Sequence, residues 1–173
     1  MSVFTRRLFL LRHAEADQPL GVSDHARPLT ERGQKQGAAV GAYLAQEGLV
    51  PEFALVSTAL RTRSTWDEVQ KKLGGPMIPV EFEQAIYEAR PHAILEAIQG
   101  LPSQPRSILL LGHNPGMHSV ALQLTGAGDQ RMRDRLSSEF PPASLAVIEF
   151  DSADWGGIDT GSGRLERFAI PSN

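Results

Sequence analysis

The chain has 173 residues, of which 41% are apolar and 21% charged, with a net charge of -3 and an isoelectric point near 5.9. This composition is typical of a single globular domain, here residues 1–173, and argues against a nucleic-acid or membrane-surface binder. The chain has no cysteine, which excludes disulfides and thiolate metal sites and suits the reducing cytoplasm, where we expect the protein to act.

The first part of the chain alternates strand and helix patterns. Residues 3–11 are predicted to form a strand buried on both faces, and a polar loop with Pro19 and Pro28 follows. Thr30 is a suitable cap for a helix over Glu31–Gln46. A short strand over Phe53–Ser57 and a helix over 59–73 come next, and the helix ends at a Gly-Gly-Pro breaker.

The second part continues this alternation. Residues 78–83 are predicted as a strand, 91–98 as a helix, 107–112 as a strand that turns directly into a helix, and 143–150 and 164–170 as closing strands. The connection over 151–163 is rich in Gly, Ser and Asp and indicates a mobile loop. The pattern predicts an α/β fold, a three-layer α/β/α sandwich with a mostly parallel central sheet. No segment is long enough to span a bilayer.

Polar residues gather where three of the predicted strands end. Arg12 and His13 end the first strand, Ser57 ends the second, and His113 follows Gly112 at the end of a central one. In mostly parallel sheets ligands bind outside the carboxyl ends of the strands. We therefore expect these side chains to meet at one edge of the sheet.

The segment GHNPG, residues 112–116, places His113 beside a helix start. Asn114 is predicted as the N-cap and Pro115 as the first helical residue, so that free amides and the helix dipole favour an anion there. The alternative is a capped helix with an incidental histidine.

Arg61 falls in the first turn of its predicted helix, where the dipole disfavours a cation. A bound anion would offset that cost. The alternative is a surface arginine paired with Asp67 or Glu68. Arg63 points about 200° around the helix from Arg61, so we do not expect it to take part.

Two arginines and two histidines at strand ends describe a pocket for a phosphoryl group. Arginine binds phosphate oxygens bidentately, and histidine is the remaining nucleophile because the chain has no cysteine and no serine in a nucleophile elbow. The flanking cations should keep His13 neutral and able to attack phosphorus. His113 could stabilise charge on the equatorial oxygens.

The blocks LRHAEA, DHARPLTERG, STALRT and LLLGHNPG, in this order, resemble the histidine phosphatase superfamily, and the second block resembles its small SixA-type phosphohistidine phosphatases in particular. The resemblance covers about two-thirds of the chain and implies a phosphoglycerate mutase-like fold. It implies His13 as the phospho-accepting nucleophile, with Arg12, Arg61 and His113 binding phosphate. Arg27 would reach in from the loop after the first strand, or else cap a carbonyl there. Asn114 is a further candidate phosphate ligand.

Larger members of that superfamily carry an acidic residue after the third strand that protonates the leaving oxygen. Here Glu83 and Glu88 are the candidates, with Glu88 preferred as a general acid, although we expect it to face solvent or to begin the next helix. Without an acid, phosphate esters would react slowly and phosphohistidine would be affected little.

We therefore expect a metal-independent phosphatase that needs no cofactor and hydrolyses phosphohistidine on a signalling or phosphotransfer protein through a covalent intermediate on His13. The alternatives are a phosphatase or mutase for small phosphate esters, and a catalytically silent domain that binds a phosphorylated protein. We also expect His113 to act in its protonated form, which would give the rate a maximum with pH.

Overall fold

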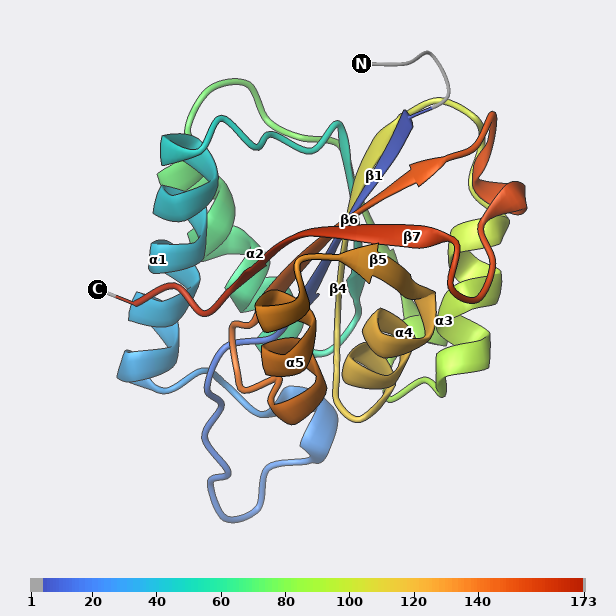
Figure 1. Cartoon of the computed structure of the whole chain (residues 1–173). Helices are drawn as coiled ribbons and strands as arrows, with labels where there is room; N and C mark the ends of the chain where they lie inside the picture. The colour runs from blue at the N-terminus through green and yellow to red at the C-terminus, as the bar shows by residue number, and fades with distance from the viewer. Residues whose placement is uncertain (1–4, 173) are drawn as a thin grey trace.

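The computed structural model describes residues 5–172, and in it seven strands and five helices follow one another along the chain (Figure 1). The strands are β1 (Thr5–Arg12), β2 (Phe53–Ser57), β3 (Val80–Glu83), β4 (Ser107–Gly112), β5 (Thr125–Gly128), β6 (Leu145–Asp151) and β7 (Gly163–Ala169). The helices are α1 (Glu31–Gln46), α2 (Leu60–Leu73), α3 (Pro91–Gln99), α4 (Gly116–Leu124) and α5 (Gln130–Ser138). The part of the predicted first strand over residues 3–4 lies outside the described residues.

All seven strands form one sheet in the order β3-β2-β4-β1-β6-β7-β5. The first four strands in that order run parallel, β6 is antiparallel to both of its neighbours, and β5 is parallel to β7. The mostly parallel sheet expected from the sequence is confirmed. The crossover connections place β1 and β4 side by side at its centre, so their carboxyl ends open on the same edge.

Helices cover the two faces of the sheet, with α1 and α2 on one side and α3, α4 and α5 on the other (Figure 1). Side chains along β1 point alternately to the two faces of the sheet, so this strand contributes to the core under each layer of helices. Leu8 and Leu10 belong to the core under α3 and α4, whereas Phe9 and Leu11 belong to the core under α1 and α2. All four are fully buried, as a central strand covered on both faces requires.

Close packing between α1 and α2 fixes the helix that carries Arg61. At Gly41 of α1, a Cβ atom would lie 2.4 Å from the carbonyl oxygen of Val69 of α2. Only glycine permits backbones to approach this closely. The two helices therefore form one closely packed layer beside β2.

The structure differs from the sequence expectations in three places. The pair β5 and α5 was not predicted, because Thr125–Gly128 is glycine-rich and α5 buries only Leu136 fully. The connection over 151–163 is anchored rather than loose, since Trp155 is fully buried and its indole N–H donates to the carbonyl of Pro105 at 2.8 Å. The helix after β4 begins at Gly116 with Pro115 as its N-cap, so a two-residue turn separates it from His113.

Candidate active site

The carboxyl ends of β1 and β4 bring the two predicted catalytic histidines together. Arg12 lies opposite Gly112 in the ladder between these strands, and the next residues are His13 and His113. Their ring centroids are 5.3 Å apart, and both residues are buried. The convergence expected from the strand ends is confirmed for this pair.

A main-chain hydrogen bond determines which nitrogen of His13 can attack. Its Nδ1 lies 2.8 Å from the carbonyl oxygen of Ala14, which can only accept, so Nδ1 carries the proton and Nε2 keeps its lone pair. Burial, and then the charges of nearby arginines, lowers the pKa of His13 to about 4. The imidazole is therefore neutral near pH 7, as the sequence analysis expected.

His113 lies between Ser57 and Tyr87. Its Nε2 is 2.7 Å from Ser57 Oγ, and the Tyr87 ring packs edge-on against the imidazole with centroids 5.4 Å apart. Burial first, and then the charges of His13 and Arg61, lowers the pKa of His113 to about 3. The expectation that His113 acts in protonated form is wrong for the free protein, because a buried ring beside arginines disfavours a second proton.

Arg61 is turned into the site instead of pairing on the surface with Asp67 or Glu68. Its side chain is 3% exposed, and its guanidinium donates to the main-chain carbonyl of Asp24 at 2.7 Å and to the carboxylate of the same residue at 3.1 Å. Arg63 points elsewhere and lies over the Phe82 ring at 4.5 Å, as its place on the helix predicted.

Three buried nitrogen atoms of the site have no hydrogen-bond partner among residues 5–172. They are Nε of Arg12, Nε of Arg61 and Nδ1 of His113. Buried donors without partners are costly, and the large majority of buried polar atoms in folded proteins are paired. Both guanidinium nitrogens are obligatory donors, so this cluster is suited to bind an anion with several oxygens.

Arg27 and Asn114, the other two phosphate-ligand candidates, already have partners. Arg27 donates to the carbonyl of Asp17 at 3.0 Å and to the Asp24 carboxylate at 3.2 Å, and its charge contributes to lowering the pKa of His13. The Asn114 amide donates to the carbonyl of Phe140 at 2.8 Å. The contact of Arg27 with a carbonyl, one of two alternatives, is confirmed, and phosphate binding by both residues stays a prediction.

Glu88 lies at the rim of the site. Its carboxylate is 3.7 Å from Arg61, and its side chain is 58% exposed. Glu88 precedes α3 and has a φ of 51°, a left-handed conformation that non-glycine residues rarely adopt and that is found preferentially at functional sites. It therefore faces both solvent and the site. Glu83, the other candidate acid, accepts the amide of Ala85.

Sequence reasoning missed Asp24, His25 and Tyr87 as parts of the site. The Tyr87 hydroxyl donates to the Asp24 carboxylate, and the His25 ring packs edge-on against Tyr87 with centroids 4.9 Å apart. The hydrogen bond from Tyr87, followed by those from Arg27 and Arg61, holds the pKa of Asp24 well below its usual range. These residues lie in loops and short turns, where no periodic pattern indicates the direction of a side chain.

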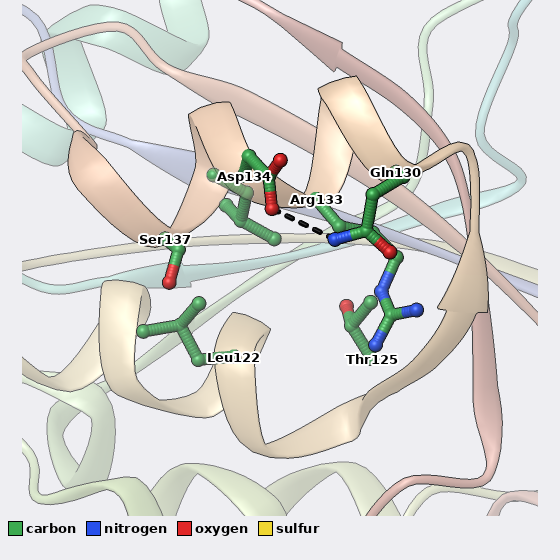
Figure 2. A pocket seen from close by; sticks show the side chains of 7 residues that line it. Leu122, Thr125, Gln130, Arg133, Asp134 and Ser137 are labelled. Carbon is green, nitrogen blue, oxygen red and sulfur yellow. Dashed lines mark hydrogen bonds between the residues drawn. The ribbon is translucent and has the colours of Figure 1, made fainter.

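A separate cavity of about 270 Å³ lies between α4 and α5 (Figure 2). At the edge of this cavity, Gln130 of α5 donates a hydrogen bond to Asp134 at 2.8 Å. None of the predicted site residues lines the cavity.

Across residues 5–172, no three His, Asp or Glu side chains gather as metal ligands would. No helix in that part of the chain has the length and apolar character that crossing a bilayer needs.

Comparison with known proteins places this geometry in context. A family model described as the histidine phosphatase superfamily (branch 1) matches residues 8–91, a segment that contains Arg12, His13, Arg27, Arg61 and Glu88. An uncharacterized protein of Mycobacterium leprae is 30% identical over 166 residues, which cover 93% of this chain and 99% of the relative.

Two solved structures resemble the whole chain. The "putative phosphohistidine phosphatase SixA from Agrobacterium tumefaciens" is 29% identical, with a TM-score of 0.81 over 96% of this chain and 98% of that one. A phosphoglycerate mutase from Plasmodium falciparum is 19% identical, with a TM-score of 0.63 over 98% of this chain and 93% of that one. The second likeness confirms the expected phosphoglycerate mutase-like fold.

Proposed function

Because the chain belongs to the histidine phosphatase superfamily, we propose that it is a phosphohistidine phosphatase acting on a signalling or phosphotransfer protein. One observation carries the proposal. His13, neutral and with Nε2 free of hydrogen bonds within residues 5–172, lies beside the three buried nitrogens of Arg12, Arg61 and His113 that have no partner. A nucleophile next to unsatisfied buried donors is what phosphoryl transfer requires.

The reaction has two steps. In the first, Nε2 of His13 attacks phosphorus, the substrate's P–N bond breaks, and its electron pair goes to the leaving imidazole nitrogen, which ends as neutral imidazole after proton uptake. In the second, water attacks the phosphorus on His13, the new P–N bond breaks with its electron pair returning to Nε2, the proton that water loses passes to solvent, and inorganic phosphate leaves. The arginines bind the phosphoryl oxygens in both steps, so no metal ion is needed to offset their charge.

Two considerations support phosphohistidine as the substrate. The chain is similar over its length to a structure described as a SixA phosphohistidine phosphatase. In addition, imidazole is a much less basic leaving group than an alkoxide, so its departure depends less on a positioned acid. We also propose that residues 1–173 act as one catalytic domain in the cytoplasm.

Phosphatase activity on small phosphate esters is a second candidate, and the position of Glu88 favours it. A carboxylate 3.7 Å from Arg61 is near enough to the proposed phosphate site to serve an ester leaving oxygen. A mutase would share this pocket, but the total amount of phosphate ester would stay constant because no inorganic phosphate is released. A catalytically silent domain would bind the phosphorylated protein and leave its phosphoryl group in place.

The deciding experiment compares specific turnover of a histidine-phosphorylated carrier protein with turnover of sugar phosphates and other small esters, by release of inorganic phosphate. We expect the phosphohistidine protein to be hydrolysed fastest, with and without EDTA. Faster turnover of any sugar phosphate would contradict the proposed substrate. Ester conversion without phosphate release would identify a mutase, and binding without turnover would identify a silent domain.

A further inference from the structure

The buried hydroxyl of Ser57 forms a hydrogen bond with His113. Ser57 ends β2 and His113 follows β4, and these neighbouring parallel strands pair Val56 with Leu111 immediately before the site. The Ser57 side chain is fully buried, and its Oγ lies 2.7 Å from Nε2 of His113. Two strands of the sheet therefore hold this hydrogen bond in place.

The direction of that hydrogen bond follows from the other partners of Ser57. Its Oγ accepts the main-chain N–H of Ala59 at 3.5 Å, and within residues 5–172 the only acceptor for its own proton is Nε2 of His113. If His113 were the donor, the hydroxyl proton of Ser57 and the lone pair of His113 Nδ1 would both be buried without a partner, at about 1–3 kcal/mol for the proton alone. With Ser57 as the donor, only the proton on Nδ1 lacks a partner, and a bound phosphoryl oxygen can accept it. Ser57 therefore donates, and Nε2 accepts.

We propose that Ser57 is a positioning residue, which keeps the proton of His113 on Nδ1 so that this N–H can donate to an oxygen of the transferring phosphoryl group. The proposal deepens the proposed phosphatase function and rests on it for the identity of the anion. Nδ1 is buried and has no partner among the described residues, so an oxygen of a bound phosphoryl group would satisfy the N–H it carries.

The two histidines then have complementary roles although both are protonated on Nδ1. In His13 the carbonyl of Ala14 accepts that proton, which leaves the Nε2 lone pair free to attack. In His113 the Ser57 hydroxyl occupies Nε2, which leaves the Nδ1 proton free to donate. Because burial keeps the pKa of His113 at about 3, this ring stabilises charge as a neutral donor and does not release a proton.

The first test needs no variant and no substrate. Nitrogen NMR of histidine side chains in the wild-type protein at pH 7 distinguishes a protonated Nδ1 from a protonated Nε2. We expect His113 to carry its proton on Nδ1, and we expect its Nδ1 resonance to shift when inorganic phosphate is added. A proton on Nε2 would overturn the proposal, whatever the protein's substrate proves to be.

The second test replaces Ser57 with Ala and uses Ser144→Ala as a matched control, since Ser144 is also fully buried but its hydroxyl donates to the carbonyl of Pro141. In Ser57→Ala we expect His113 to populate both tautomers and kcat to fall by about 10- to 100-fold, with a smaller change in KM. The control should keep the wild-type tautomer and kcat. An unchanged tautomer in Ser57→Ala would overturn the proposal.

A double variant separates positioning from packing. In a His113→Ala background, Ser57→Ala should reduce kcat no further, because the hydroxyl acts only through the imidazole. A further loss equal to that in the wild-type background would overturn the proposal. If phosphohistidine proves not to be the substrate, the tautomer measurements still decide the role of Ser57, so the two proposals can fail independently.

Discussion

The carboxylate of Asp24 binds both Arg61, at 3.1 Å, and Arg27, at 3.2 Å, so one anionic side chain of the protein occupies two of the arginines proposed to bind phosphate. The Tyr87 hydroxyl donates to the same carboxylate. Asp24 is therefore ionised at every working pH, because these partners hold its pKa well below the usual range. A dianionic phosphoryl group entering the site meets this negative charge.

Replacement of Asp24 with Asn should strengthen inhibition by inorganic phosphate by roughly three- to tenfold, because it removes a repulsion of about 1 kcal/mol beside the phosphate site. The inhibition constant for phosphate is the measurement. Asp17→Asn is the control, since Asp17 is exposed on the same loop and its carboxylate accepts only the amide of Gln18 among the described residues. Weaker inhibition in Asp24→Asn would show that the carboxylate mainly orients Arg61.

His13→Ala should abolish both turnover and covalent labelling by radioactive phosphorylated substrate, since the arginines cannot attack phosphorus and Nε2 of His113 is engaged by Ser57. The labelled residue is identified by mass spectrometry after rapid quenching. His92→Ala is the matched control, because the His92 side chain is 83% exposed and pairs with Glu96 on its own helix. Activity that survives His13→Ala but is lost with EDTA would contradict the mechanism.

Glu88→Gln distinguishes the two candidate substrate classes. If Glu88 protonates an ester oxygen, the variant should lose about 10²-fold or more in kcat for small esters, and it should change phosphohistidine turnover by less than about threefold. Glu83→Gln is the control, because Glu83 accepts the amide of Ala85. Equal losses on both substrate classes would show that Glu88 acts through Arg61 and does not protonate the leaving group.

The lowered pKa values of His13, about 4, and His113, about 3, predict acid sensitivity. Between pH 6.5, where histidine titrates in the unfolded chain, and pH 4, the unfolded state binds protons that the folded state does not. The free energy of unfolding should therefore be highest above pH 6.5 and fall as the pH drops. Urea unfolding at pH 7 and pH 5 should show a smaller decrease for His113→Asn than for the wild type.

Gly33→Ala should destabilise the protein by about 1–3 kcal/mol through overpacking. A Cβ atom there would lie 2.0 Å from the carbonyl oxygen of Glu15, which accepts the amide of Thr30 at the start of α1. The readout is the denaturation midpoint. Gly100→Ala is the control, since its nearest contact would be 3.4 Å, and it should be tolerated. Equal midpoints for the two variants would refute the close approach.

Much of the fold was predictable from the sequence because strands and helices obey local rules. The helix over Glu31–Gln46 and the strand over Phe53–Ser57 have the bounds that capping and apolar pattern indicate. The pair β5 and α5 was not predictable in this way, because α5 is mostly polar and β5 contains two glycines. Their place depends on the pairing of β5 with β7, a contact distant in the sequence.

The sequence by itself determined which residues stand at the strand ends, and therefore that His13 and His113 meet. Parallel strands bring their carboxyl ends to one edge whatever the loops do. Only the tertiary structure decided what each side chain contacts. Asp24 pairs with Arg61, Glu88 lies near Arg61 at the rim of the site, and Ser57 forms a hydrogen bond with His113. A hydrogen-bond partner, a tautomer and a pKa depend on positions within an ångström and on burial, which arise from the packing of segments far apart in the chain.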